Sequence, residues 1–275
     1  MGAPGDIEFD DDVQRRIYRH VERSGTTTVD DVRDEIRVPA PAGSKPARSG
    51  TTEPRVRLPP EEFRDHVDAM VEAGHLVERD GTLHLAFDEG TEEYTEGDLT
   101  YRIRPARESD RRGIEAAIRE VAEEGTSIAG ERVAAEIDEQ GALLRHNDRK
   151  ARMFFVGEVA SDEDGGDEWS DGEGEIAGWV HVDAPELDKL RHTGELTVGV
   201  RERYREHGIG SRLLERAIDW ADEANYRKVY QSVPATNETA IDLLQDHGWE
   251  TEAVREDHYL VGEEFVDEVM MAREP

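Results

Sequence analysis

The stretch from Gly194 to Ala221 constrains the fold more than any other part of the chain, because it changes from a strand pattern to a helix pattern around two glycines. Leu196, Val198 and Val200 alternate with smaller residues, which predicts a strand with one buried aliphatic face. After Gly208-Ile209-Gly210-Ser211 the spacing of apolar residues becomes helical. These residues are Leu213, Leu214, Ala217, Ile218 and Ala221.

This junction between a strand and a helix favours the binding of an anion. The first backbone N–H groups of a helix have no partner within it, and the helix dipole places partial positive charge there. Gly208 and Gly210 lack the Cβ atoms that would hold a phosphate away from those amides, and Arg205 adds a permanent cation. The alternative interpretation is a loop with two glycines that has no binding function. The flanking strand and helix instead favour a site for a phosphate or diphosphate.

Two segments resemble a known family. Val200 to Gly210, followed by an amphipathic helix, resembles the acyl-coenzyme A loop of the GNAT acetyltransferases, Q/R-x-x-G-x-G/A. Asn237-Glu238-Thr239-Ala240-Ile241, then Leu243 and Gly248-Trp249, resembles the family's N-x-x-A-I-x-L-(Y)-x-x-x-G-F. Both motifs stand in the family's order, and the resemblance covers about residues 100–275.

The resemblance implies a fold and a cosubstrate. Residues 100–275 are expected to form the α/β (α+β) GNAT fold, with a mixed, mostly antiparallel central sheet. Acetyl-CoA is the implied cosubstrate, its pantetheine arm lying along the strand from Leu196 to Val200, and no metal is required. The implied cofactor-binding residues are Val198, Val200, Arg205, His207, Gly208, Ile209, Gly210, Ser211, Asn237 and Ala240.

The proton acceptor is also suggested by the resemblance. Glu195, at the start of the central strand, occupies a place where several family members carry a glutamate base that acts through water. The alternative is that Glu195 is a solvated strand end. His192 is a second candidate for the catalytic base.

The proton donor is less clearly marked. The tyrosine that the family often carries seven residues after the asparagine is replaced by Leu244, which cannot donate a proton. Tyr259 is the candidate acid in our prediction, and Tyr230 and His247 are alternatives. Departure of the thiolate without an acid also stays open.

The first ninety residues predict a separate small domain. Three helices and a hairpin with an Asp80-Gly81 turn resemble a winged helix-turn-helix module over residues 1–90, interrupted by a Pro- and Gly-rich insertion at 39–56. Residues 91–99 are expected to be an acidic linker.

The charge of the third helix bears on the partner of this domain. Its exposed positions are mostly acidic, and phosphate affinity comes mainly from Lys and Arg. We therefore expect a docking or dimerisation domain rather than a DNA-binding one, and a homodimer stays open. The acidic positions are Glu61, Glu62, Asp65, Asp68 and Glu72.

The composition says more about the cellular environment of the protein than about its function. The chain has no cysteine, so disulfides and thiolate chemistry are excluded. No apolar run approaches the ~20 residues needed to span a bilayer, which predicts a cytoplasmic protein without membrane contact. The net charge is -32, and 30 of the 34 basic residues are Arg. This balance resembles that of haloarchaeal-type proteins, since concentrated salt screens such self-repulsion.

An acidic, Gly-rich loop at 161–175 is expected to be disordered, because it lacks calcium-loop spacing.

The sequence thus predicts an N-acetyltransferase that moves an acetyl group from acetyl-CoA to a primary amine by direct attack in a ternary complex. The acceptor is a small molecule or a peptide: an amino acid, a small amine, a protein N-terminus or a lysine. Two alternatives stay open, namely an acyl-CoA-sensing regulator or scaffold, and a transcription factor that binds DNA through the N-terminal domain.

Overall fold

The computed structural model describes residues 9–39, 55–86, 90–123, 132, 133, 137, 142–146, 151–160, 174–184, 187 and 189–275. The chain divides into two compact units. One spans Ile7–Phe87, and the main part of the other spans Asp88–Pro275.

The N-terminal unit packs three helices against a small sheet of strand order β1-β5-β4. Asp11 caps the first helix and Thr28 caps the second, because each side chain accepts hydrogen bonds from first-turn N–H groups. Phe63, Val67 and Met70 of the third helix are buried in the core of this unit. The elements are α1 (Asp12–Ser24), β1 (Thr27–Thr28), α2 (Val29–Glu35), α3 (Pro60–Glu72), β4 (Leu76–Arg79) and β5 (Thr82–Leu85).

Two short pairings in this unit are absent from the sequence prediction. β1 pairs with β5, and β2 (Val38–Pro39) pairs with β3 (Arg55–Val56). The second pairing joins the two ends of the expected insertion at 39–56, so these ends are ordered strands rather than irregular chain. Residues 40–54 lie outside the described part.

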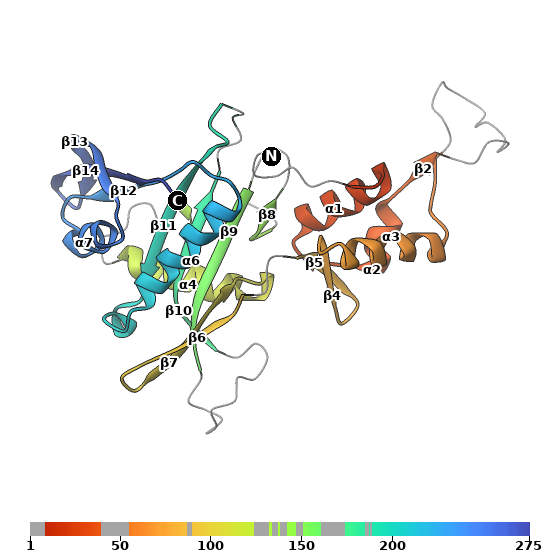
Figure 1. Ribbon diagram of the computed structural model, residues 1–275, viewed down its shortest axis with the longest axis horizontal. Helices are drawn as coiled ribbons and strands as arrows, with labels where there is room; N and C mark the ends of the chain where they lie inside the picture. The colour runs from red at the N-terminus through yellow and green to blue at the C-terminus, as the bar shows by residue number, and fades with distance from the viewer. Residues whose placement is uncertain are drawn as a thin grey trace. The chain divides into compact units, whose positions relative to one another are not determined.

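The C-terminal unit is built on a nine-stranded sheet of order β13-β14-β12-β11-β10-β9-β7-β6, with β8 paired to β9 (Figure 1). All neighbouring strands are antiparallel except β11 and β12. The strands are β6 (Glu92–Glu96), β7 (Leu99–Pro105), β8 (Arg145–His146), β9 (Ala151–Val159), β10 (Glu175–Asp183), β11 (Thr193–Val200), β12 (Lys228–Pro234), β13 (Glu250–Val261) and β14 (Glu264–Arg273). The helical segments are η1 (Glu108–Asp110), α4 (Arg111–Glu123), η3 (Glu202–Tyr204), α6 (Ile209–Glu223) and α7 (Glu238–Asp246).

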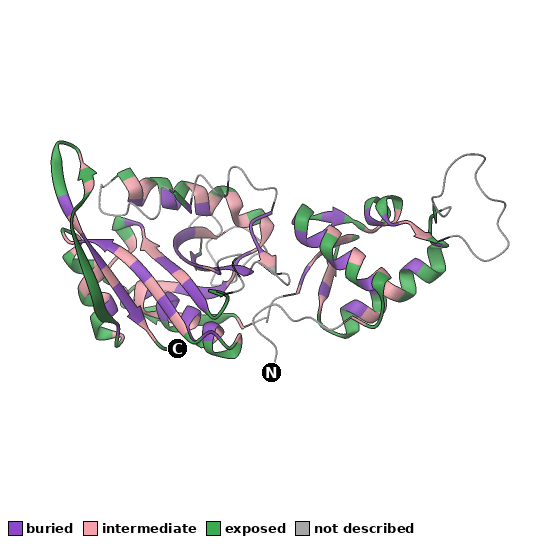
Figure 2. Cartoon of the chain, turned by 90° about the horizontal axis from the view of Figure 1, so that it is seen from above, coloured by how far each residue is buried: buried purple, intermediate pink, exposed green. Residues whose placement is uncertain are grey.

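Glycines let helices approach both faces of this sheet closely. A Cβ on Gly157 of β9 would lie 2.8 Å from Ile209 of α6, and one on Gly178 of β10 would lie 3.2 Å from Leu213. On the opposite face, a Cβ on Gly113 of α4 would lie 2.7 Å from Ile176. The central strands are therefore covered on both sides, which explains why strand residues of both parities are buried (Figure 2).

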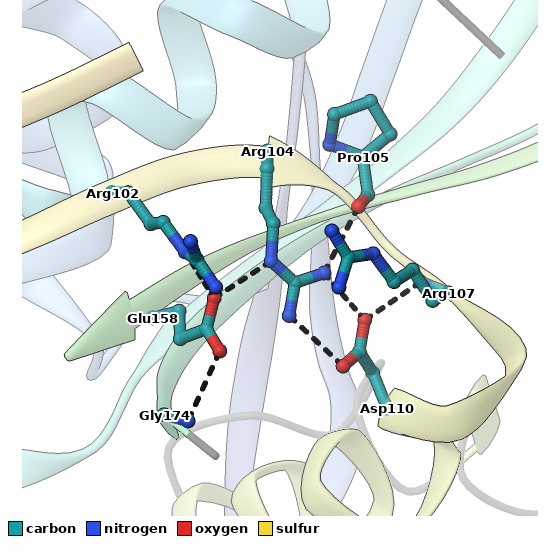
Figure 3. A network of polar contacts seen from close by, with 7 residues as sticks. All are labelled: Arg102, Arg104, Pro105, Arg107, Asp110, Glu158 and Gly174. Carbon is teal, nitrogen blue, oxygen red and sulfur yellow. Dashed lines mark hydrogen bonds and ion pairs between the residues drawn. The ribbon is translucent and has the colours of Figure 1, made fainter. Parts of the chain in front are cut away.

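A network of buried charges ties β7 to β9 and to η1, just before α4 (Figure 3). Arg102 Nε and Arg104 Nε donate to Glu158 Oε2 at 2.5 and 2.7 Å, and Arg104 also donates to both oxygens of Asp110. Burial by itself would raise the pKa of Glu158, but the hydrogen bonds from Arg104 and Arg102 outweigh it and lower the pKa to about 2. Because each charge has an opposite partner, the network can be buried without an orphaned ion.

The structure corrects two expectations about the C-terminal half. The acidic linker predicted at 91–99 contains β6, which pairs with β7 and stacks Tyr94 on Tyr101. The spacing of Val133, Ile137 and Leu144 predicts a helix over Gly130 to Leu144, but residues 142–144 are irregular and lead into β8. Most of that segment, and the loop predicted at 161–175 up to residue 173, lie outside the described part.

The last two strands are longer than predicted. The alternation predicts short strands around Tyr259–Val261 and Glu268–Ala272, whereas β13 and β14 form a hairpin beginning at Glu250. β13 is exposed over most of its length because it is the outer strand of the sheet (Figure 2). An exposed strand shows no apolar alternation, so the sequence pattern does not reveal it.

Candidate functional site

β11 and β12 form a fork at the centre of the sheet. They pair in parallel only at Thr193–Lys228, Gly194–Val229 and Glu195–Tyr230, although the structure describes both strands throughout. Beyond Glu195, β11 continues to pair with β10, so its edge toward β12 has no strand partner. Backbone groups on such an edge can pair with an extended ligand as they would with another strand.

The N-terminus of α6 has no side-chain cap, which among the described α-helices is also true of α3. Asp11, Thr28 and Asn237 each cap a helix with a side-chain oxygen, whereas no described side chain caps α6. The N–H groups of its first turn are therefore left for another acceptor. With the helix dipole, they form an arrangement suited to an anion.

The two glycines at this end of α6 serve different purposes. Gly208 is the N-cap and has φ 73°, a left-handed conformation that favours glycine. Gly210 is helical, and a Cβ there would make ordinary contacts with Leu243 at 3.4 Å and Val200 at 3.6 Å. The protein itself does not require glycine at position 210, so the missing side chain is explained better by a ligand that approaches the backbone.

The loop before α6 is held in place by Glu175 at the start of β10. Tyr204 donates a hydrogen bond to Glu175 at 2.6 Å, and Arg201 and Arg203 form ion pairs with the same carboxylate. Burial and the hydrogen bond to Glu175 raise the pKa of Tyr204. The approach to the α6 N-terminus is thus anchored to the sheet, a feature that the sequence analysis missed.

The predicted cofactor-binding residues in the loop have distinct positions. Arg205 Nε donates to the Val200 carbonyl at 2.9 Å, so its guanidinium bonds back to the end of β11. Ile209 is buried and packs over Gly157, which leaves only its backbone for a ligand. His207 and Ser211 are half-buried beside the uncapped turn.

The remaining predicted cofactor-binding residues lie on β11 and at the start of α7. Val198 and Val200 are half-buried, whereas the sequence pattern predicts that they are as buried as Leu196. The difference arises at the fork, where β12 no longer covers the edge of β11. Asn237 caps α7 by accepting a hydrogen bond from Ala240 N at 3.1 Å.

Glu195 lies at the point where the fork opens, on the face of the sheet opposite α6. It forms an ion pair with Arg132 and stands beside Tyr230 of β12 and opposite Asp183 of β10. Burial raises the pKa of Tyr230, and the charge of Glu195 raises it further. A carboxylate and a protonated phenol are thereby brought together at the fork.

The other candidate acids and bases lie elsewhere. Tyr259 is on β13, three strands away from β11, and donates to Glu268 at 2.9 Å; burial and this hydrogen bond raise its pKa. His192 is exposed and precedes β11 at the joined end of the fork. His247 lines a cavity of about 620 Å³ at that same end, together with Lys228. Of the residues considered from sequence, Glu195 and Tyr230 are the pair that the fold brings together.

Two further polar groups near the fork and α6 were missed. The Tyr101 hydroxyl is buried 3.5 Å from the position of a Cβ on Gly208, and its pKa is raised by burial. Gln231 is buried on β12 next to the last β11–β12 pair. A period-2 reading of Val229, Gln231 and Val233 would have marked Gln231 as a polar residue on a buried face.

Two absences hold for the described part of the chain. Within it, no group of three or more His, Asp or Glu side chains is arranged to hold a metal ion. Likewise, none of the helices described is long and apolar enough to cross a membrane.

Comparisons with known proteins support the assignment of the C-terminal unit. Residues 115–249 match the family described as Acetyltransferase (GNAT) family. The L-amino acid N-acetyltransferase AaaT of Escherichia coli (strain K12) is 24% identical over 102 residues, which are 37% of this chain and 63% of that relative. The match therefore spans somewhat less than two thirds of the relative's length.

Solved structures of similar proteins cover the same part of the chain. An acetyltransferase of the GNAT family from Streptococcus pneumoniae is 25% identical, covers 63% of this chain and 98% of its own, and has a TM-score of 0.49. A phosphinothricin acetyltransferase from Sinorhizobium meliloti, solved in complex with acetyl-CoA, is 17% identical, covers 62% and 86%, and has a TM-score of 0.48.

The family match supports a GNAT acetyltransferase domain at residues 115–249 of the C-terminal unit. The family match includes the fork, α6 and α7, and the sheet is mixed and mostly antiparallel. The prediction of a GNAT domain is therefore confirmed for residues 115–249, and the described strands confirm the mixed, mostly antiparallel sheet.

Proposed function

We propose that the C-terminal unit transfers an acetyl group from acetyl-CoA to a primary amine by direct attack in a ternary complex. The observation that carries the proposal is the uncapped N-terminus of α6 beside the fork between β11 and β12. Acetyl-CoA supplies the thioester that an amine can attack. The features present fit it, since a diphosphate suits free helix amides and an extended amide-bearing arm suits an unpaired strand edge.

We assign the diphosphate to the backbone amides of the first α6 turn, with His207, Gly208, Gly210 and Ser211 around it. The edge of β11 from Leu196 to Val200 holds the arm, with Asn237 facing it from α7. Holding both reactants at the fork supplies much of the rate enhancement by proximity.

Glu195 is the proposed base. Its carboxylate takes a proton from the amine nitrogen, directly or through a water molecule, so that the nitrogen lone pair becomes available. Tyr230 is the proposed proton donor to the sulfur, because it lies beside Glu195 and remains protonated. Tyr259 and His192 lie farther from the fork, and we give them no step.

The acceptor belongs to the amine class. An amino acid is supported by the name of the Escherichia coli relative, while small amines and peptide amines fit the same chemistry.

We infer that residues 1–90 form a winged-helix-like docking module, since α3 exposes mainly carboxylates. The acidic composition supports a cytoplasmic setting with concentrated salt.

The rival proposal is a regulator that binds acyl-CoA without turnover, and it is favoured by the buried Leu244 at the family's tyrosine position. Calorimetric titration with acetyl-CoA, followed by turnover assays over a panel of amino acids and amines, separates the two. We expect binding and turnover, both measured at low and high salt. Binding without turnover of any amine supports the regulator, and the absence of binding rejects both proposals.

A further inference from the structure

Gln231 occupies an unusual position at the fork. It follows Tyr230, whose pairing with Glu195 is the last between β11 and β12. Because successive strand residues point to opposite faces, Gln231 faces away from Glu195, on the side where α6 packs. Its neighbours on that face, Val229 and Val233, are buried and apolar.

The side chain of Gln231 is buried without complete hydrogen bonding. The residue is only 6% exposed, and its Oε1 atom has no hydrogen-bond partner among the described residues. A buried carbonyl oxygen without a donor weakens the fold, and an apolar side chain of the same size would avoid that cost. Glutamine at position 231 is therefore unfavourable in the protein without a ligand, and it becomes favourable when a donor binds its oxygen.

The fork indicates which donor could reach this oxygen. Gln231 is the first β12 residue whose neighbouring β11 edge is unpaired, and it lies on the face of the sheet that α6 covers. The oxygen has almost no accessible surface, so a ligand in the fork reaches it where the side chain turns toward the unpaired β11 edge. The pantetheine arm of acetyl-CoA carries two amide N–H groups, which are donors of the required kind.

We propose that Gln231 Oε1 accepts a hydrogen bond from a pantetheine amide of acetyl-CoA, which makes Gln231 a cofactor-binding residue of the fork. The inference rests on the proposed function and adds to it a residue that binds the arm rather than the diphosphate. It predicts effects of opposite sign on ligand binding and on stability. Removing the amide should weaken binding of the cosubstrate while stabilising the protein that has no ligand.

The test compares Gln231→Met and Gln231→Leu with the wild-type chain, and uses Gln245→Met on the exposed face of α7 as the matched control. Affinities for acetyl-CoA and for adenosine 3′,5′-bisphosphate, which lacks the arm, are measured by calorimetry. Melting temperatures are measured without ligand. We expect the Kd for acetyl-CoA to rise by about 3- to 10-fold in both Gln231 variants. The Kd for the bisphosphate should not change, and the melting temperature should rise by about 2–4 °C.

Each other outcome overturns the inference in a recognisable way. Unchanged acetyl-CoA affinity rejects the contact, and a raised KM for the amine alone assigns the oxygen to the acceptor instead. A lower melting temperature in both variants shows that Gln231 has an internal partner. An equal loss of affinity for the bisphosphate indicates a general disturbance of the site. If the wild-type chain does not bind acetyl-CoA, the proposed function itself fails.

Discussion

Two polar regions of the C-terminal unit differ in whether their polar groups find partners within the protein. In the network of Arg102, Arg104, Asp110 and Glu158, every buried charge has an opposite partner (Figure 3). At the fork and the start of α6, helix amides lack a cap and Gln231 Oε1 lacks a donor. The charges of the first region are paired with one another within the protein, whereas the second region leaves helix amides and an amide oxygen for a ligand.

The comparison separates residues that stabilise the fold from residues that prepare for a ligand. Changes in the satisfied network should cost stability and leave the chemistry of the fork alone. Changes at the fork should cost binding or turnover and leave stability unchanged or improved. Unpaired polar groups of this kind persist where function requires them.

The largest effect is expected from Glu158→Gln. Removing one charge leaves two buried guanidinium groups with a single remaining carboxylate, so the free energy of unfolding should fall by about 3–5 kcal/mol. All four tryptophans follow residue 160, so their fluorescence during denaturant unfolding reports on the C-terminal unit. The control is Glu252→Gln, which breaks an exposed pair with Lys228 and should cost less than about 1 kcal/mol. Equal effects of the two changes would remove the distinction between the regions.

The same network should make stability depend on acid. The pKa of Glu158 is lowered from 4.5 to about 2, so its contribution is fully present above pH 4.5 and is lost as the pH falls through 2. That shift corresponds to about 3 kcal/mol. Unfolding of the wild type and of Glu158→Gln is compared from pH 6 to pH 2, where the gap between them should close. A gap that stays constant contradicts the assignment.

The next effect is expected from Gly210→Glu. The structure has room for a Cβ at this position, and a carboxylate in the first turn of α6 favours the helix dipole. A diphosphate at the same amides would be repelled, so the affinity for acetyl-CoA should fall by at least about 100-fold while stability is retained. Gly210→Ala is the matched control, since it adds the Cβ without the charge. Wild-type affinity in Gly210→Glu would show that the α6 N-terminus does not bind the diphosphate.

A comparable or smaller effect is expected from Glu195→Gln. Loss of the base should lower turnover near neutral pH by about 100-fold and change the shape of the pH–rate profile, with the Kd for acetyl-CoA unchanged. Glu250→Gln, at the exposed start of β13, serves as the control. An unaltered pH–rate profile would remove Glu195 from the mechanism. Stability measured on the same samples checks that the fork tolerates the change.

Local pattern explains which elements could be predicted. The segment from Gly194 to Ala221 combines a period-2 strand, two glycines and a helical stripe, and these signals depend on neighbours in sequence. β6 and most of β13 lack such a signal, because their exposed residues are mainly charged or polar. Each forms by pairing with the strand beside it, β7 or β14. Local propensity therefore missed strands whose stability comes from a partner.

The sequence by itself determined the glycine junction before α6, the capping asparagine at 237 and the strongly acidic balance, because each is a property of residues close together in the chain or of composition. Only the tertiary structure decided that β11 and β12 separate after Glu195, that Tyr230 rather than Tyr259 lies beside it, and that Gln231 is buried without a donor. These relations depend on the register between strands distant in sequence, and on what covers each face of the sheet. A local pattern can mark Gln231 as a polar residue on a buried face, but it does not encode these relations.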